Sequence, residues 1–384
     1  MRQPYIAALL VSCIYLTAPH SRALALPTMI RLGYTNCAAC HISPQGGSLL
    51  NAYGRSIDQA QSLRGGEYQP PENSWLKTLD WGGRITQDVR VVLQEQATST
   101  TNQQGTDLFR SRFMYRNATE LGDGWRFSFV GTGENVSVLR PTLAYEPPSS
   151  SASFFVNTAL VSYRASKNLE FAVGRDQLPT GINVPDLSYF IKARNGLGYY
   201  DSPTQVKAFW WGKRYQISPY GFGPGGNERS GAHESGGGAL AEVDVLGKQR
   251  TILGVNLLRG TSANVDRRLI GPYARLGFGK WGILAEHDLT DRSSNNGSFA
   301  AFRQNASYGQ VFWAPREWLV ASVIGERLQI DLPFAERIRA GRLEVTARLA
   351  SQVTVGVSGR LQRNDINGRV GSSVMFQIAF KTVN

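Results

Sequence analysis

The chain has 384 residues, with 41 Lys and Arg against 29 Asp and Glu, which gives a net charge of +12. Aromatic residues make up 10% of the chain and charged residues only 18%, a composition that excludes an intrinsically disordered protein. Beyond the first thirty residues there is no apolar run of about 18 residues, which excludes a bundle of membrane-spanning helices.

The first twenty-five residues have the pattern of an export signal. A positive start at Arg2 precedes a largely apolar stretch over 5–18, and the small-x-small triplet over 23–25 is typical of a cleavage site. We therefore expect removal of residues 1–25. In an alternative interpretation, 10–13 is a lipoprotein cleavage box that follows an unusually short apolar core.

Residues 37–41 read C-A-A-C-H, the attachment signature of c-type haem. Two thiols at this spacing add to the two vinyl groups of one haem, and the histidine directly after them lies beneath the iron. We predict one covalent haem c on Cys37 and Cys40, with His41 as the proximal iron ligand. A disulfide, a zinc knuckle and a thioredoxin-type redox pair are the alternatives. Zinc would need further ligands nearby, and no Cys or His follows His41 before His233.

The segment that carries this motif, 26–78, is too short to be a free-standing cytochrome. It offers one short helix over 51–60, and the Gly and Pro residues over 65–71 predict a linker. A stretch of about fifty residues cannot bury the apolar faces of a haem by itself. We expect the rest of the chain to supply the pocket.

From about residue 79 the pattern changes to strict alternation of apolar and polar residues, which predicts strands with one apolar face. Sixteen strands are expected. They cover 79–95, 107–121, 125–140, 153–165, 167–176, 203–212, 214–223, 236–246, 249–260, 268–279, 281–290, 301–313, 317–329, 336–349, 351–363 and 369–381.

The joins between these strands alternate between tight turns and longer loops, of which 177–202 and 224–235 are examples. Such an asymmetry between the two rims is typical of outer-membrane barrels. The prediction is therefore an all-β fold: an antiparallel transmembrane β-barrel of about sixteen strands over 79–384, with the short N-terminal mono-haem c segment as a plug. The tight turns are expected on the periplasmic side, and the longer loops are expected to face outward.

Charged residues of several strands share one face, which we expect to line the lumen because a charge near the bilayer middle costs several kcal/mol. Most of these charges suit a solvated porin wall. Some of the arginines are expected to bind the haem propionates or to bridge to lumen acids. The propionate candidates are Arg84, Arg110, Arg112, Arg342 and Arg360.

The sixth iron ligand has several candidates. Met114 and Met375 have inward parity on strands near the barrel seam, and Met29 lies within the motif segment itself. A methionine ligand would raise the haem potential, whereas the alternative role of these residues is to fill gaps in packing. His287 shares a strand face with apolar residues and is expected to point toward lipid, and His233 lies in a long loop.

The chain resembles the fused cytochrome–porins of the bacterial outer membrane, which include iron oxidases of iron-oxidising bacteria. Their haem segment continues into a Leu-Asn-x-aromatic-Gly-Arg stretch, and here the C-A-A-C-H motif is followed by L-N-A-Y-G-R over 50–55. The resemblance implies a sixteen-stranded barrel with one haem. It also implies electron transfer between an extracellular donor such as Fe(II) and periplasmic electron-carrier cytochromes.

Together these features predict an outer-membrane electron-transfer protein that oxidises an extracellular reductant, with Fe(II) as the substrate implied by the resemblance. Its expected partners are outer-membrane lipid, the reductant and periplasmic cytochromes, and no nucleic acid. A passive diffusion porin with a structural haem plug and a haem-based redox or gas sensor are the alternatives. Solute flux through the lumen would favour the porin, and an open sixth iron position would favour the sensor.

Overall fold

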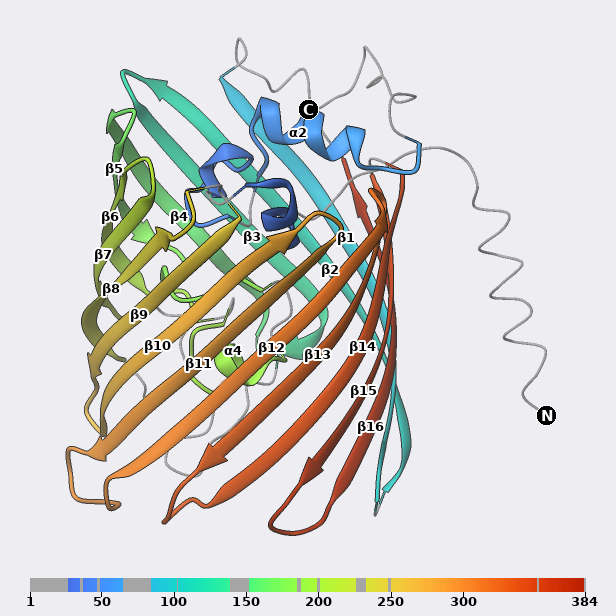
Figure 1. Cartoon of the computed structure of the whole chain (residues 1–384). Helices are drawn as coiled ribbons and strands as arrows, with labels where there is room; N and C mark the ends of the chain where they lie inside the picture. The colour runs from blue at the N-terminus through green and yellow to red at the C-terminus, as the bar shows by residue number, and fades with distance from the viewer. Residues whose placement is uncertain are drawn as a thin grey trace.

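A computed structural model shows one closed antiparallel barrel of sixteen strands, in which neighbours along the chain pair and β1 closes the ring against β16 (Figure 1). The predicted fold class is confirmed. The structure describes residues 27–34, 37–46, 49–64, 84–101, 103–138, 152–184, 188–198, 201–225, 233–247, 250–350 and 352–382. The predicted export signal and the predicted linker over 65–71 lie outside these residues.

The strands occupy the predicted places, with ends that shift by a few residues. Their bounds are β1 (Ile85–Thr100), β2 (Gln103–Gly122), β3 (Trp125–Val138), β4 (Ala152–Ser166), β5 (Leu169–Arg175), β6 (Thr204–Trp211), β7 (Tyr215–Gly223), β8 (Ser235–Asp244), β9 (Thr251–Thr261), β10 (Val265–Phe278), β11 (Trp281–Ser294), β12 (Phe302–Arg316), β13 (Leu319–Ile330), β14 (Glu336–Ala350), β15 (Val353–Asn364) and β16 (Val370–Lys381).

Alternation fixes which side chains enter the lumen. In β10, Arg267, Leu269, Tyr273 and Arg275 are buried inside the barrel, while Ile270 on the opposite face is exposed. The same two-residue period runs through β11, β12 and β13. Because the period of a strand is two, a register slip of one residue would carry these lumen arginines to the outer face.

One rim carries tight turns, as at 279–280 and 317–318, and the other rim carries most of the longer loops. Two predicted joins on the loop rim are wrong, however. The β9–β10 join is only 262–264, and β1 and β2 extend past their predicted ends until only 101–102 separates them. Polar residues such as Thr98–Thr100 continue the ladder there, because strand pairing beyond the membrane needs no apolar face.

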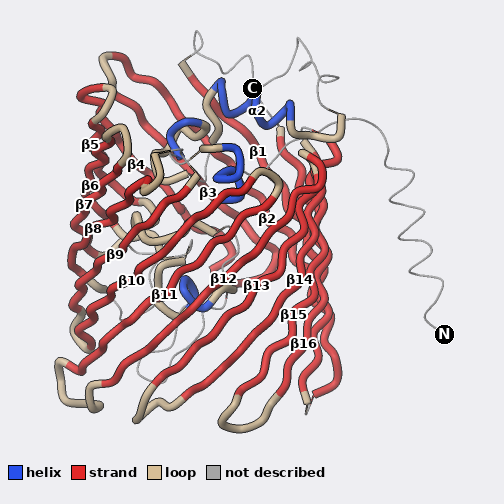
Figure 2. The backbone as a smooth tube through the Cα atoms, in the orientation of Figure 1, coloured by secondary structure: helices blue, strands red, loops and turns tan. Residues whose placement is uncertain are grey.

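The four described helical elements lie at one end of the barrel or inside it (Figure 2). They are η1 (Pro27–Leu32), η2 (Cys37–Ala39), α2 (Ala52–Ala60) and α4 (Phe190–Ala193). The predicted helix over 51–60 is α2, and Asn51 is its N-cap. α2 lies across the end that carries the tight turns, whereas α4 lies in the interior (Figure 1).

The join between β5 and β6, residues 176–203, does not face outward as predicted. It folds back into the lumen, where Ile182, Tyr189, Phe190 and Ile191 are buried against the inner faces of the strands. The physical reason is that burial inside the barrel removes its apolar side chains from water, which is favourable. Buried acids of the wall accept bonds from its backbone: Glu286 from Ile182 N at 2.7 Å and Glu326 from Phe190 N at 2.8 Å.

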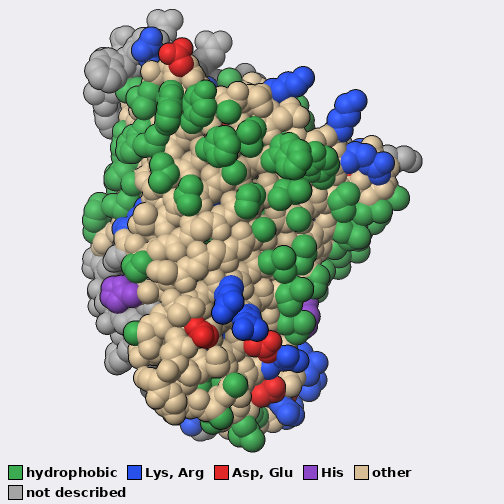
Figure 3. Space-filling view, turned by 90° about the vertical axis from the view of Figure 1, so that its left-hand side faces the viewer, with side chains coloured by type: hydrophobic (Ala, Val, Ile, Leu, Met, Phe, Trp, Pro, Cys, Tyr) green, Lys and Arg blue, Asp and Glu red, His purple; other side chains and the backbone are tan. Residues whose placement is uncertain are grey.

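The outer face of the wall is apolar over a broad band (Figure 3). Exposed residues of this band include Phe113, Phe154, Val206, Val323 and Leu343. An outward apolar band is the surface that a lipid bilayer covers in barrel proteins. Among the helices that the structure describes, none is long and apolar enough to cross a membrane.

Candidate functional site: the Cys-x-x-Cys-His segment in the barrel mouth

The C-A-A-C-H motif forms a single turn of 3-10 helix. The backbone N–H groups of Cys40 and His41 both donate to the carbonyl of Cys37, at 3.2 and 2.9 Å. Cys37 and Cys40 form no disulfide, and both are partly accessible. His41 is buried and forms an isolated β-bridge with Leu50. The turn therefore holds two free thiols and the histidine of the motif within five consecutive residues.

The L-N-A-Y-G-R stretch locks this turn in place. Asn51 donates from its side chain to the carbonyls of Ala38 and Ala39 at 3.2 and 3.1 Å, and its side-chain oxygen caps α2 at Gly54 N. Gly54 lies directly on the motif, because a Cβ at this position would come within 2.0 Å of the Cys40 carbonyl oxygen. Only glycine allows this approach, which explains why Asn and Gly stand at these positions.

The aromatic position of the same stretch forms a contact with the chain that precedes the motif. The hydroxyls of Tyr34 and Tyr53 lie 2.6 Å apart, and their rings meet edge to face. This hydrogen bond raises the pKa of Tyr34 to about 12. The motif is thus enclosed by its own segment on both sides in the sequence.

The residues of this segment fit a covalent c-type haem. Gly46, at φ +77°, lies against both Cys37 and His41: a Cβ there would be 3.2 Å from Cys37 Sγ and 3.9 Å from His41 Cδ2. A side chain at this position would crowd the face that the thiol and the imidazole share. Free thiols and an adjacent imidazole are the donor set that haem c requires. Among the described residues, no cluster of three or more His, Cys, Asp or Glu side chains forms a separate metal site.

The barrel holds the motif segment (residues 27–64) through contacts from several strands and from the inward-folded 176–203 join. Arg31 forms an ion pair with Glu317 at 2.7 Å, and the Ile30 carbonyl packs so closely on Gly277 that a Cβ there would lie 2.4 Å away. At the other end of the segment, Leu63 N donates to the Arg348 carbonyl at 3.0 Å.

Gln45 connects the segment to the lumen. Its side-chain amide donates to the Gln177 carbonyl at 3.0 Å, and its backbone carbonyl accepts from Asn183 at 3.2 Å. Lys207 on β6 donates to the side-chain oxygen of Gln45 and forms an ion pair with Asp176 at 2.7 Å. The segment and the 176–203 join therefore meet inside the barrel, one entering from each rim.

Arg275 is the charged residue that the sequence analysis missed. It points inward from β10, and its guanidinium is close enough to the Cys37 thiol for its charge to lower the pKa of that thiol. Glu242 of β8 pairs with it at 2.7 Å and also accepts from the Tyr273 hydroxyl at 2.6 Å. Inward parity was the one available signal, and it does not separate Arg275 from the other lumen arginines.

Both motif thiols have raised pKa values. Burial is the main cause at Cys37, where the nearby guanidinium of Arg275 acts in the opposite direction, and Glu242 raises the pKa further. Burial is also the main cause at Cys40, and the carboxylate of Asp58 adds to it. Both thiols therefore stay neutral up to a higher pH than an ordinary cysteine does.

The predicted propionate arginines occupy different places along the wall. Arg112 pairs with Glu134 at 2.5 Å, and Arg110 approaches the same carboxylate at 3.5 Å. Arg342 and Arg360 lie over the rings of Tyr189 and Phe190, and Arg360 pairs with Glu326 at 3.0 Å. Arg84 is exposed just before β1. Several of these arginines thus form ion pairs with acids of the lumen, which was one of their expected roles. Binding of haem propionates by them stays a prediction.

Of the candidates for the sixth ligand, the two strand methionines face inward, as their parity predicted. Met114 is buried with Val92 and Ala379 in a small apolar cluster on the inner wall. Met375 lies on β16, where its sulfur accepts from Gln94. Met29 is half-buried in η1. Which of them reaches the iron stays a prediction. His287 is exposed on the outer face, as expected, and bonds Ser307 at 2.8 Å.

No family model and no curated protein matches the chain. Solved structures do match it. OmpT of Vibrio cholerae superposes with a TM-score of 0.54 at 11% identity, over 78% of this chain and 98% of that one. The anion-selective porin from Comamonas acidovorans gives 0.56 at 11% identity, over 78% and 100%. OmpF of Salmonella typhi, solved with daunomycin, gives 0.56 at 11% identity, over 78% and 97%.

These identities are too low to carry more than the fold. The likeness of these structures agrees with the closed antiparallel barrel. The chain thus has the barrel fold of outer-membrane porins.

Proposed function

We propose that this protein is a single-haem electron conduit of the bacterial outer membrane. Cys37 and Cys40 bind one haem c through thioether bonds, and His41 is the proximal iron ligand. The observation that carries the proposal is the position of the motif segment: it is fastened inside a porin-type barrel by Arg31, Gln45 and Leu63. A soluble cytochrome would not need these contacts with a barrel wall.

The residues around the motif have distinct tasks in this proposal. Asn51 and Gly54 hold the backbone of the motif turn from which both thiols extend, and these thiols would hold the haem through two thioether bonds. Arg275 would place a positive charge beside the thioether-linked edge of the haem, opposite the edge that carries the propionates. The bound group supplies one-electron transfer.

The barrel gives the site access from two sides. The apolar band of an outer-membrane barrel is about 25 Å tall, which is thicker than one haem. The motif segment enters from the rim of tight turns, which we assign to the periplasm, and periplasmic electron-carrier cytochromes are the partners there. The loop rim then faces outward, where an extracellular reductant such as Fe(II) approaches the lumen.

Reduction of the haem by Fe(II) tests this proposal. Oxidised full-length protein in detergent is mixed with Fe(II), and the visible spectrum is followed. The proposal expects conversion to the reduced haem spectrum with one electron per chain. The Cys37→Ala/Cys40→Ala variant should give no such change. A haem that stays oxidised in the presence of excess Fe(II) would exclude iron as the donor.

A passive diffusion porin is the second candidate, because the barrel fold is the fold of porins. In that case the motif segment would be a structural plug. Swelling of liposomes that contain the protein in a small sugar measures solute flux. Fast flux in the haem-loaded protein would favour the porin, and flux that appears only after the motif segment is deleted would favour the conduit.

A further inference from the structure

The two ends of the outer wall carry different side chains beside the apolar band. Aromatic pairs lie at the end with the tight turns, where Trp281 stacks on Trp313 and Trp210 meets Tyr215. At the loop end, charged residues of both signs gather below the band (Figure 3). Aromatic residues form girdles at the lipid–water interfaces of such barrels, and arginine is tolerated there at little cost.

The clearest group is a row of three arginines, which we call the outer arginine row: Arg327 on β13, Arg339 on β14 and Arg363 on β15. All three are exposed and point outward. Arg327 is directly opposite Arg339 in the strand register, and Arg339 is directly opposite Arg363. A similar pair, Arg259 and Arg268, is directly opposed on β9 and β10.

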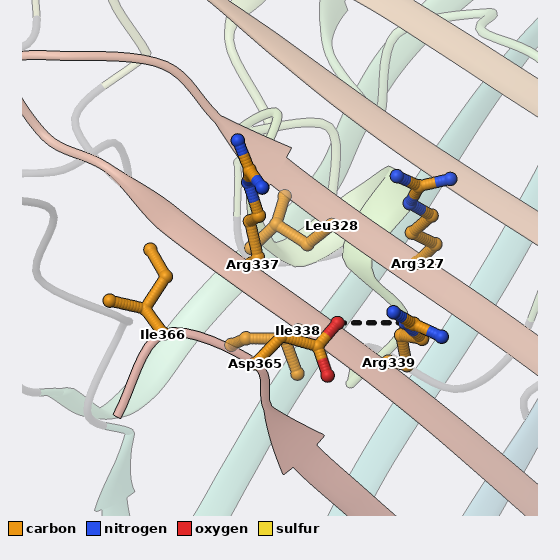
Figure 4. Close-up of a pocket in the computed structure, with 7 residues that line it drawn as sticks. All are labelled: Arg327, Leu328, Arg337, Ile338, Arg339, Asp365 and Ile366. Atoms are coloured by element: carbon orange, nitrogen blue, oxygen red, sulfur yellow. Dashed lines mark hydrogen bonds and ion pairs between the residues drawn. The ribbon is translucent and has the colours of Figure 1, made fainter. Parts of the chain in front are cut away.

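Like charges that are directly opposite in a sheet destabilise it. One acid offsets this row within the structure: Asp365 binds Arg339 at 2.7 Å. Asp365 also lies in a shallow pocket with Arg327, Arg337 and Arg339 (Figure 4). The pocket thus gathers three guanidinium groups and one carboxylate, which leaves an excess of positive charge that an external anion would offset.

The depth of the row identifies the source of that anion. On β15, the exposed apolar Leu361 is two residues from Arg363 and belongs to the band. On β13 and β14, the exposed Val323 and Leu343 are each four residues from the arginine of their strand. At about 3.4 Å per residue, the row is about 7–14 Å from the apolar band. That is the depth of lipid headgroups, where arginine costs about 0–1 kcal/mol.

We propose that the outer arginine row binds the phosphate groups of an anionic glycolipid in the outer leaflet. Guanidinium groups bind phosphate oxygens in a bidentate manner. Arg327, Arg337 and Arg363 are available for this purpose, and Arg339 shares its charge with Asp365. The proposal rests on the orientation given under the proposed function, with the loop rim outside, but it does not need the haem.

Binding of lipid A in neutral detergent micelles tests the proposal. Full-length protein is titrated with lipid A that bears two phosphates and with the same lipid after removal of both phosphates, and bound lipid is counted by native mass spectrometry. The proposal expects the phosphorylated lipid to bind more tightly. The R327Q/R339Q/R363Q variant should lose about fivefold in affinity per arginine, or about a hundredfold in total.

A matched variant controls for net charge. K167Q/K213Q/R316Q removes three exposed cations at the tight-turn end and should bind lipid A as the unchanged protein does. An equal loss in both variants, equal binding of the dephosphorylated lipid, or displacement by inorganic phosphate at concentrations equal to the lipid would overturn the proposal. Heat-dependent gel migration reports folding of each barrel, and the Fe(II) spectrum of the same samples reports the haem function separately.

Discussion

The barrel wall and the motif segment are held together in different ways. Each strand of the wall pairs along most of its length with two neighbours, so each position is fixed by many repeated bonds. The motif segment has two short 3-10 turns and one nine-residue helix, and it depends on single contacts such as Asn51 with the motif carbonyls and Arg31 with Glu317. Changes to the segment should therefore damage the haem site while the barrel persists.

Loss of both thiols should separate the two regions most sharply. In Cys37→Ala/Cys40→Ala, we expect no covalently bound haem at all, because the third cysteine, Cys13, lies in the predicted export signal. The wall should still close, since its ladders include neither residue. Haem staining on a denaturing gel and heat-dependent migration measure the two outcomes. Haem stain in the double variant would refute the attachment site.

Arg275→Gln changes a residue that belongs to both regions. Breaking a buried ion pair costs about 3–5 kcal/mol, because Glu242 would remain without its cation. The loss of a positive charge beside the haem should also lower its reduction potential, since the oxidised iron carries the extra positive charge.

Arg126→Gln is the matched control for this change. Arg126 pairs with the buried Glu170 at 2.6 Å, and Arg164 also pairs with Glu170 at 3.1 Å, so its loss should destabilise the wall less than the loss of Arg275 and leave the potential unchanged. Spectroelectrochemical titration gives the potential, and urea unfolding gives the stability. Equal potential shifts in both variants would show that Arg275 has no special relation to the haem.

Gly54→Ala should have a smaller effect that is confined to the motif segment. The new Cβ would come within 2.0 Å of the Cys40 carbonyl oxygen, so α2 must move away from the motif. Overpacking of this kind costs about 1–3 kcal/mol. We expect less covalent haem per chain and a lower urea midpoint for the haem band. Ser56→Ala, on an exposed face of α2, should behave as the unchanged protein does, and a similar loss there would argue against the contact.

The pH dependence of the motif thiols gives the subtlest test. Burial raises the pKa of Cys37, so haem-free Cys40→Ala protein should react with iodoacetamide more slowly at pH 8 than it does in urea. The rate should climb as the pH rises through the raised pKa. The neutral thiol is favoured by the fold, so the stability that it contributes is present below the ordinary thiol pKa and is lost as the pH rises. Equal rates with and without urea would place the thiol in water.

Much of the fold could be predicted from the sequence because alternation is a local signal. Each of β3, β15 and β16 shows its lumen and lipid faces within a dozen residues, and the tight turns mark the strand ends. The end of β1 at 100 and the start of β10 at 265 were missed, because polar residues beyond the membrane carry no alternation. The inward course of 176–203 was also missed. Apolar residues in a join show that it is buried, but they do not show whether a partner protein or the lumen of its own barrel buries it.

Within the site, Cys37, Cys40 and His41 were predicted from their spacing, and L-N-A-Y-G-R now has a physical basis in Asn51 and Gly54. Arg275 could not be singled out, because its relation to Cys37 depends on how the segment enters the lumen. Inward parity selects many arginines equally. Tertiary placement alone distinguishes the one that lies beside the motif.

Electron transfer across a closed membrane tests the central claim most directly. Liposomes that contain the full-length protein enclose ferricyanide, and a membrane-impermeant reductant is added outside. The account predicts that the trapped ferricyanide bleaches at a rate set by the haem-loaded protein, with no leakage of dye of similar size. The Cys37→Ala/Cys40→Ala protein should give only the rate of empty liposomes. Equal bleaching with and without the haem cysteines, or bleaching that follows dye leakage, would contradict the conduit and identify a passive pore.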